Sequence, residues 1–184
     1  MTRNDRDLTL DVEFLLTRGE RVFVERIDIE GNTTTLDRVV RRQFRVVEGD
    51  PFIPRQIRES AERVRALGFF GNANVEAREG STPQQVVIDV DVEEAPTGSL
   101  SFGGSYSTNS GFGAAISFSE RNFLGRGQRL SFGINTAENS ANYSFSFTEP
   151  SFLARDVAYN FSINYLETDN DSAEFDTVIG NFST

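Results

Sequence analysis

The sequence of 184 residues contains no cysteine, no histidine and no tryptophan, and all 18 of its basic residues are arginine. Without cysteine the chain forms neither a disulfide framework nor a thiolate metal site, and it suits any compartment, including an oxidising one. Without histidine or cysteine, the usual Ser–His and Cys–His nucleophilic arrangements are impossible within it. We therefore expect a protein that is not an enzyme and that uses no metal ion and no cofactor.

Positive charge is scarce and unevenly placed. The net charge of −10 argues against a nucleic-acid partner, because phosphate binding depends on clustered cations. Residues 1–97 hold 14 arginines and 19 acidic residues, whereas residues 98–184 hold 4 and 9. This change predicts a domain boundary at Pro96 and Thr97. No apolar segment follows Met1, so we expect an internal or mature segment without a signal peptide or a membrane helix.

Residues 1–20 contain one short amphipathic strand. Its apolar residues share one parity, which is the period of a half-buried strand; they are Leu8, Leu10, Val12, Phe14 and Leu16. A lone amphipathic strand is not stable by itself. We therefore expect this strand to belong to a domain that precedes the segment.

Residues 21–96 are predicted to form a compact α+β domain in the order strand, helix, helix, strand, strand. The strands are expected at 21–30, 74–78 and 85–93. Thr34 and Asp37 resemble a capping box that opens the first helix, and Pro54 suits the first turn of the second. The apolar positions at helical spacing are Leu36, Val39, Val40 and Phe44 in the first helix, and Ile57, Ala61, Val64 and Leu67 in the second.

Three further features of this domain have structural interpretations. Gly68 is expected to end the second helix in a left-handed conformation, and Phe69 and Phe70 are expected to fill the core. In the last strand, apolar residues alternate with the carboxylates of Asp89, Asp91 and Glu93. We interpret these carboxylates as the solvated face of a strand and not as a cation site.

Two surfaces of the α+β domain are candidates for binding. Arg38, Arg41, Arg42 and Arg45 are expected on the outer side of the first helix, where they form either a docking surface for an acidic partner or a solvated face. The strand of Asn74, Val75, Glu76, Ala77 and Arg78 is expected at the edge of the sheet. An exposed edge can pair with an incoming peptide by β-augmentation.

Beyond Gly98, apolar and polar residues alternate persistently. The apolar parity runs through Leu100 to Tyr106, Phe112 to Phe118, Leu130 to Ile134, Tyr143 to Phe147 and Val157 to Tyr165, with a sixth strand from about Phe175. Alternating segments separated by turns predict an antiparallel transmembrane β-barrel. The alternate positions carry Ser, Gly, Asn and Ala, which suits the water-filled interior of a barrel. Six strands are too few to close a barrel, since the smallest single-chain examples have about eight.

Seven stretches together resemble one family. VERIDIEGNTTT, DRVVRRQF, EGDPF, ALGFF, TGSLSFGGSYS, RNFLGRGQRL and TEPSFL occur in an order and spacing similar to those of the outer-membrane β-barrel assembly factors, the BamA family. The resemblance covers nearly the whole chain. It implies that 21–96 is the last polypeptide-transport-associated (POTRA) domain and that 1–20 holds the final strand of the POTRA domain before it. Residues 97–184 would then be the N-terminal part of an outer-membrane β-barrel, about six strands of sixteen.

The resemblance also implies a function. Such proteins fold and insert β-barrel proteins into the Gram-negative outer membrane, and their POTRA domains receive unfolded outer-membrane proteins in the periplasm. The first barrel strand forms a lateral gate where a substrate strand adds. Here that strand is Gly98, Ser99, Leu100, Ser101, Phe102, Gly103, Gly104, Ser105 and Tyr106. Its glycines are expected to weaken pairing with the last strand, with curvature or close packing as the alternative reason for them.

The implied partners are unfolded outer-membrane proteins, outer-membrane lipid and accessory lipoproteins. In related proteins an accessory lipoprotein meets the last POTRA domain at the helix that here carries Arg38, Arg41, Arg42, Gln43 and Arg45. Some relatives have Glu at the position of Gln43.

Two other functions fit the same pattern. A two-partner secretion transporter shares the plan of POTRA domains and a barrel but exports a dedicated passenger; it normally has two POTRA domains and a plug helix. A soluble β-rich binding protein, built from the α+β domain and a β-sandwich, is the alternative outside the membrane, because the strands of a sandwich also alternate.

Overall fold

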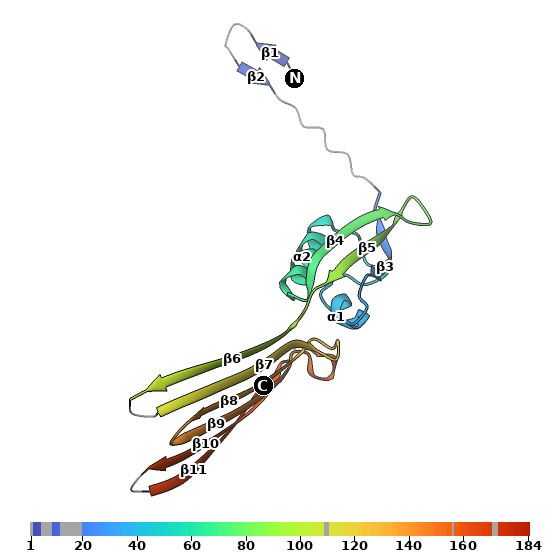
Figure 1. Cartoon of the computed structure of the whole chain (residues 1–184). Helices are drawn as coiled ribbons and strands as arrows, with labels where there is room; N and C mark the ends of the chain where they lie inside the picture. The colour runs from blue at the N-terminus through green and yellow to red at the C-terminus, as the bar shows by residue number, and fades with distance from the viewer. Residues whose placement is uncertain (1, 5–8, 12–19, 109–110, 156, 171–172) are drawn as a thin grey trace.

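The computed structural model describes residues 2–4, 9–11, 20–108, 111–155, 157–170 and 173–184, and its two main units follow one another along the chain (Figure 1). The first unit is a three-stranded sheet with two helices, and the second is a six-stranded sheet. Three residues join them, between β5 (Gln85–Glu94) and β6 (Gly98–Ser107). This short connection lies where the charge pattern of the sequence changes.

The strand predicted from Leu8 to Leu16 lies only partly within the described residues. Thr9–Asp11 forms β2, which pairs antiparallel with β1 (Thr2–Asn4). Positions 12–16 lie outside the described residues. The assignment of this strand to a preceding domain therefore stays a prediction.

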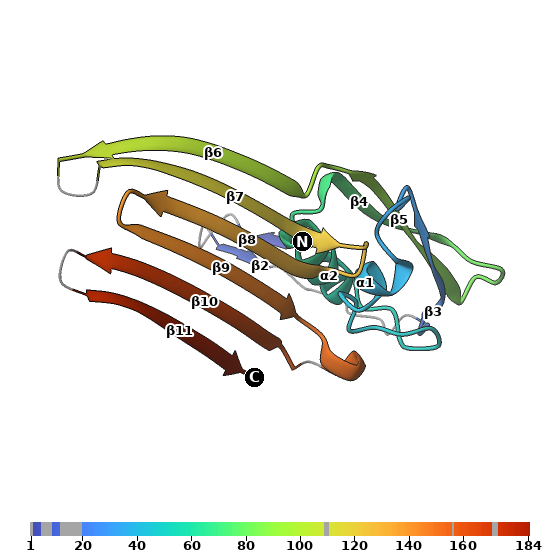
Figure 2. The same cartoon turned by 60° about the horizontal axis from the view of Figure 1, so that its bottom comes forward.

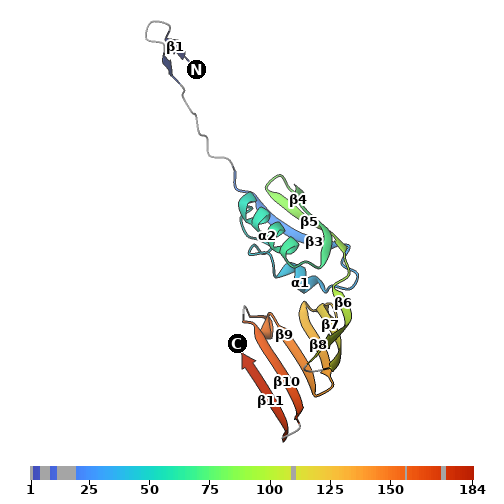
Figure 3. The ribbon, with the colours of Figure 1, turned by 60° about the vertical axis from the view of Figure 1, so that its left-hand side comes forward.

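The α+β unit has its central strand last in the sequence. Its elements are β3 (Phe23–Glu30), α1 (Asp37–Arg41), α2 (Pro54–Ala66), β4 (Phe70–Glu79) and β5. β5 lies in the middle of the sheet, with β3 parallel on one side and β4 antiparallel on the other. Figure 3 shows α2 against this sheet and α1 at the end nearer the second unit. β4 is longer than the strand predicted at 74–78, because its pairing with β5 begins at Phe70.

The core of this unit contains apolar residues from both helices and all three strands. In β5, Ile88, Val90 and Val92 are at most 4% exposed, as their alternation with acidic residues predicted. The other buried members are Val24, Ile27, Val40, Phe44, Val46, Ile57, Val64 and Ala73. Removing this apolar surface from water is the main favourable contribution to folding of the unit.

The first helix is much shorter than predicted. It has five residues, and its N-cap residue Leu36 keeps 38% of its surface exposed. The predicted capping box of Thr34 and Asp37 is wrong, because no side chain caps this helix. The backbone N–H groups of Thr34 and Thr35 instead donate to the carboxylate of Glu94 at the end of β5. A contact that is distant in sequence therefore replaces the local cap.

The second helix follows its predicted pattern closely. α2 begins with Pro54 in its first turn, where a missing N–H costs nothing because that group has no partner inside the helix. Its buried residues are Ile57, Ser60, Ala61 and Val64. Leu67 is only half-buried, and Gly68 follows with φ of 67°, the left-handed conformation that commonly ends a helix.

The second unit is an antiparallel sheet in which neighbouring strands are neighbours in sequence (Figure 2). After β6 come β7 (Gly111–Phe123), β8 (Gln128–Ala137), β9 (Ser140–Glu149), β10 (Tyr159–Asn170) and β11 (Ala173–Ser183). A short 3₁₀ helix, Phe152–Ala154, lies between β9 and β10. Each alternating segment of the sequence forms one strand of this sheet.

The strand register aligns the apolar residues in rows on one face of the sheet, the apolar face. One row contains Leu100, Phe118, Phe132, Phe145 and Ile163, and the next contains Phe102, Ile116, Ile134, Tyr143, Tyr165 and Val178. Many of these side chains are exposed, with Phe102 reaching 82%. An exposed apolar surface of this extent marks contact with lipid or with another protein.

No helix among the described residues has the length and apolar character needed to cross a bilayer.

Two valines of the α+β unit allow a matched test of its core. We expect Val64→Ala to lower the free energy of unfolding by about 2 kcal/mol, because a fully buried side chain loses two methyl groups and leaves a cavity. Val47→Ala removes the same atoms from a side chain that is 62% exposed, so we expect a change below about 0.5 kcal/mol. Urea unfolding of residues 21–96 measures both; equal effects would contradict the core described above.

Candidate functional site

The first strand of the second sheet has an unpaired edge. β6 pairs with β7 over ten positions, from Gly98 opposite Glu120 to Ser107 opposite Gly111. No other described strand pairs with β6, so from Gly98 to Tyr106 the backbone groups on its outer side have no strand partner among the described residues. Every side chain of β6 is exposed. The strand predicted to form a gate is thus the one with a free edge on this side of the sheet, and β11 has the corresponding free edge on the other side.

The glycines in the middle of β6 are not required by backbone conformation or by crowding. Neither Gly103 nor Gly104 has a positive φ. A Cβ at Gly103 would meet no described atom within 4 Å, and one at Gly104 would make an ordinary contact of 3.7 Å with the carbonyl oxygen of Gly113. Close packing within the described residues therefore does not explain these two glycines. Their remaining effects are a missing side-chain contact and a more flexible strand.

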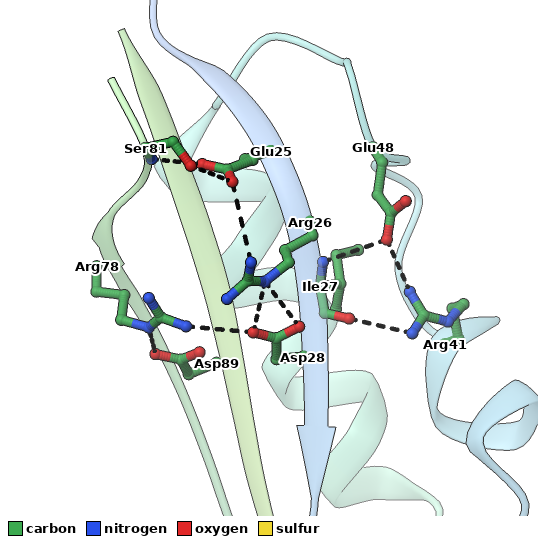
Figure 4. Close-up of polar contacts among 9 residues, drawn as sticks. All are labelled: Glu25, Arg26, Ile27, Asp28, Arg41, Glu48, Arg78, Ser81 and Asp89. Atoms are coloured by element: carbon green, nitrogen blue, oxygen red, sulfur yellow. Dashed lines mark hydrogen bonds and ion pairs between the residues drawn. The ribbon is translucent and has the colours of Figure 1, made fainter. Parts of the chain in front are cut away.

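Of the two edges of the α+β sheet, the edge of β3 is occupied (Figure 4). The carbonyl oxygen of Ile27 accepts a hydrogen bond of 3.1 Å from the guanidinium of Arg41, and its N–H donates to Glu48. Arg41 also binds Glu48 at 3.3 Å and Asp37 at 2.8 Å. The hydrogen bond with Asp37 raises the pKa of Arg41, against the effect of its partial burial. Side chains therefore cover the β3 edge at Ile27.

The β4 edge is open over the segment that the sequence predicted for peptide pairing. Within the described residues, the backbone of Asn74, Val75, Glu76, Ala77 and Arg78 bonds only to β5. Arg78 is held across the sheet by Asp89 and, at 3.2 Å, by Asp28 (Figure 4). These ion pairs fix side chains on the sheet surface and leave the backbone edge free.

The arginines predicted as one docking surface lie in different surroundings. They do not share one helix face, because α1 ends at Arg41, and Arg42 and Arg45 lie beyond the end of the helix. Arg38, Arg41 and Arg42 line one groove, whereas Arg42, Gln43 and Arg45 line another. The side chain of Gln43 donates to the carbonyl oxygen of Val39. Docking of a partner at these residues stays a prediction.

A turn between β7 and β8 joins the two units. The side-chain amide of Asn122, which is 6% exposed, donates to the hydroxyl of Thr35 at 2.8 Å, and its oxygen accepts the N–H of Gly127 at 2.8 Å. The carbonyl oxygen of Gly125 accepts the N–H of Leu36 at 2.8 Å. Buried hydrogen bonds of this kind are expensive to break, because the separated groups lose their partners. We call residues 122–127 the junction turn.

Glycine is required at two positions of the junction turn. Gly125 and Gly127 have φ of 69° and 70°. A Cβ at Gly125 would collide with the carbonyl oxygen of Thr34, and one at Gly127 would lie 3.2 Å from Val39 and 3.6 Å from Phe69. Phe69 is buried as predicted, but it lies against this turn, while Phe70 packs on the core.

Glu94 anchors the segment that the junction turn contacts. Its carboxylate accepts hydrogen bonds from the hydroxyl of Thr33 at 2.7 Å and from the N–H groups of Thr34 and Thr35. Burial opposes ionisation of Glu94, but the hydrogen bonds from Thr35, Thr33 and Thr34 outweigh it and lower its pKa to about 2. Glu94 therefore orients the Thr35 hydroxyl that Asn122 binds.

Two family models match this chain. The POTRA model, described as a surface antigen variable number repeat, matches residues 22–95. The model of the Omp85 superfamily domain matches residues 122–183. The first match covers the α+β unit and the second covers the sheet from the junction turn onward.

Individual relatives agree with these models. The outer membrane protein assembly factor BamA of Neorickettsia risticii is 32% identical over 140 residues, which is 76% of this chain and 19% of the relative. BamA of Nitratidesulfovibrio vulgaris is 34% identical over 122 residues, 66% of this chain and 15% of the relative. The crystal structure of BamA from Haemophilus ducreyi lacking POTRA domains 1–3 matches 94% of this chain and 32% of its own, with a TM-score of 0.79 and 29% identity.

This chain belongs to the BamA family. The resemblance predicted from its seven sequence stretches is thereby confirmed. The chain spans about a fifth of the length of the curated BamA relatives it matches. CdiB from Acinetobacter baumannii also matches, with a TM-score of 0.55 at 14% identity, and this likeness shows the fold alone.

The stretch RNFLGRGQRL was identified from the sequence as similar to BamA, but its contact with the α+β unit was not predicted. The alternation on either side of it predicted a turn between two strands, and the turn is present. Nothing local to the stretch indicates that Asn122 binds Thr35, which is 87 residues away. The one available signal was an asparagine followed closely by two glycines, a pattern that fits many turns.

Glu94 makes stability depend on pH. Its pKa is lowered from 4.5 to about 2, so its contribution to stability is fully present above about pH 4.5 and is lost as pH falls toward 2. We expect Glu94→Gln to destabilise residues 21–96 at pH 7 and to flatten this part of the stability profile. Urea unfolding between pH 2 and pH 7 measures the profile, with the exposed neighbour Glu93→Gln as the control. An unchanged slope in Glu94→Gln would contradict the assignment.

The junction turn can be tested through its backbone. We expect Gly125→Ala to separate the units, because a methyl group there meets the backbone of Thr34 in addition to straining a left-handed residue. Gly49 is also left-handed, with φ of 92°, but a Cβ there meets no described atom within 4 Å. Gly49→Ala thus controls for strain alone. Distances between spin labels at Arg58 and Ser162 in the full-length protein report the separation; similar distributions in both variants would rule out the contact.

Proposed function

We propose that this chain is the gate-bearing part of an outer-membrane protein assembly factor, which folds β-barrel proteins and inserts them into the Gram-negative outer membrane. The observation that supports the proposal most directly is the free edge of β6, a strand with ten exposed residues in a sheet with an exposed apolar face. The BamA relatives named above are assembly factors of this kind. The proposed role is mechanical and involves no catalysis.

The unpaired edges require a closed arrangement in lipid. Backbone groups that face hydrocarbon without a partner cost several kcal/mol each, so a spanning sheet closes on itself. We propose that β6 to β11 are about six strands of a sixteen-stranded barrel, in which β6 meets the last strand. Because the middle of β6 has glycine at positions 103 and 104, this contact has fewer side-chain pairs than an ordinary ladder. A substrate strand can therefore take the place of the last strand at β6.

The α+β unit has a separate proposed role. It lies in the periplasm, where the open β4 edge from Asn74 to Arg78 receives unfolded outer-membrane proteins by β-augmentation. Accessory lipoproteins of the assembly complex dock beside it, on the side that carries the exposed Arg45 and the partly buried Gln43. The outer-membrane lipid surrounds the apolar face.

Cross-linking tests the gate, because this segment has no cysteine of its own. A cysteine at Ser101 of β6 is expected to form a disulfide with a cysteine in the last strand of a barrel substrate that is stalled during assembly. The reason is that antiparallel partners approach to within about 5.5 Å between Cα atoms, a span that a disulfide bridges. Gel electrophoresis without reductant measures the adduct in the full-length protein.

The control is a cysteine at Ser162, which lies in β10 and is paired on both sides, with Ser146 and with Asn181. We expect no adduct there. Equal cross-linking at both positions would indicate collision without strand pairing, and no adduct at Ser101 in an active protein would contradict the gate.

A further inference from the structure

The groove lined by Arg38, Arg41 and Arg42 lies between the two units and has a volume of about 600 Å³. Arg126 of the junction turn completes its cationic lining. Phe44 and Val47 form an apolar part of the wall, and Val47 is 62% exposed. The chain as a whole has a net charge of −10, so this is a local concentration of positive charge in an acidic protein.

Most of the positive charge in the groove is not neutralised. Within the described part of the chain, the guanidinium groups of Arg38, Arg42 and Arg126 take part in no hydrogen bond or ion pair, whereas Arg41 is held by Asp37 and Glu48. One carboxylate, Glu149, faces the groove, and it accepts a hydrogen bond of 2.6 Å from Gln128. Burial lowers the pKa of Arg42, Glu149 opposes this effect, and Arg38 adds to it. An anion entering the groove would relieve this repulsion.

The strand register places the groove on the lipid side of the sheet. Gln128 is two residues from Leu130, and Glu149 is two residues from Phe147, so they share the face of those apolar residues. Leu130 and Phe147 pair with each other, and in the next row toward the α+β unit Gln128 pairs with Phe123 and Glu149 pairs with Tyr159. The groove therefore lies at the end of the apolar face that is nearer the α+β unit.

We propose that this groove binds the phosphate group of an anionic phospholipid, with the guanidinium groups of Arg38, Arg42 and Arg126 around the phosphate and the acyl chains along the apolar face of the sheet. The proposal rests on the proposed function for the contact between the apolar face and lipid. Arginine suits the ligand, because its planar fork matches phosphate oxygens. The end of an apolar, lipid-facing surface is the depth at which lipid headgroups meet a membrane protein.

This occupant fits the groove better than an acidic protein does. Arg42 and Arg126 lie where the junction turn meets the α+β unit, and Gly127 of that turn approaches Arg42 closely. A folded partner would have to enter between the unit and the membrane surface to reach them. A lipid headgroup is already at that surface.

The test titrates lipids into the full-length, detergent-solubilised protein and counts bound lipids by native mass spectrometry. We expect phosphatidylglycerol to bind the wild-type protein more tightly than phosphatidylcholine. Arg38→Gln with Arg126→Gln should weaken phosphatidylglycerol binding about 25-fold, at about fivefold for each arginine near an anionic surface. The control, Arg21→Gln with Arg58→Gln, removes the same charge from exposed arginines outside the groove and should leave binding unchanged.

Four results would overturn the proposal. They are equal weakening in both double variants, equal binding of the two lipids, full displacement of phosphatidylglycerol by millimolar inorganic phosphate, and loss of an acidic protein partner without any loss of lipid. The single variant Arg42→Gln should also weaken binding and provides a second test if the double variant misfolds. Failure of the proposed function looks different, because the wild-type protein would then bind phosphatidylglycerol yet not assemble substrate barrels in liposomes.

Discussion

Backbone hydrogen bonding in a medium without water is the constraint on which the rest of this structure depends. Inside the six-stranded sheet, β7 to β10 each have two neighbours, so their backbone groups are satisfied whatever their side chains are. β6 and β11 have one neighbour each among the described strands. The sheet thus concentrates its unsatisfied backbone at two edges. In the proposed function the protein accepts new strands at such an edge and a closed barrel otherwise hides it, and a weakly held seam meets both demands.

The junction between the units keeps the end of this edge near the α+β unit in place. Three residues connect β5 to β6, which is too short for independent movement of the units over large distances. Glu94, just before the connection, orients Thr35, and Thr35 binds the buried Asn122 at the end of β7. The two units are therefore linked twice, by the chain connection from β5 to β6 and by the hydrogen bond between Thr35 and Asn122. The same arrangement brings the arginines after α1 next to the strand ends of the sheet.

Periodicity predicted most of the fold, because both units bury or expose one face of each element. The alternation in β5 and in β6 to β10 gave the strands and the face of each residue, and α2 followed from its apolar stripe. What failed was α1, because its expected cap at Thr34 bonds instead to Glu94, 60 residues away. The arginine groove was not predicted for the same reason. Its lining comes from residues 38–47, 126–128 and 149–151, which are distant in sequence, and no local pattern joins them.

The two ends of β6 differ in how firmly they are held. At Gly98 the strand begins only three residues after β5 and pairs opposite Glu120, close to the Asn122 and Thr35 contact, so its position there is fixed from both sides. In its other half, Gly103 and Gly104 have no side chains to pack, and the strand ends at Ser107, away from the junction. Separation of β6 from a weak neighbour therefore costs least at the glycine end and most at the junction end. In the proposed function, the fixed end preserves the strand register and the loose end allows exchange, and a substrate strand that must pair in one register needs both.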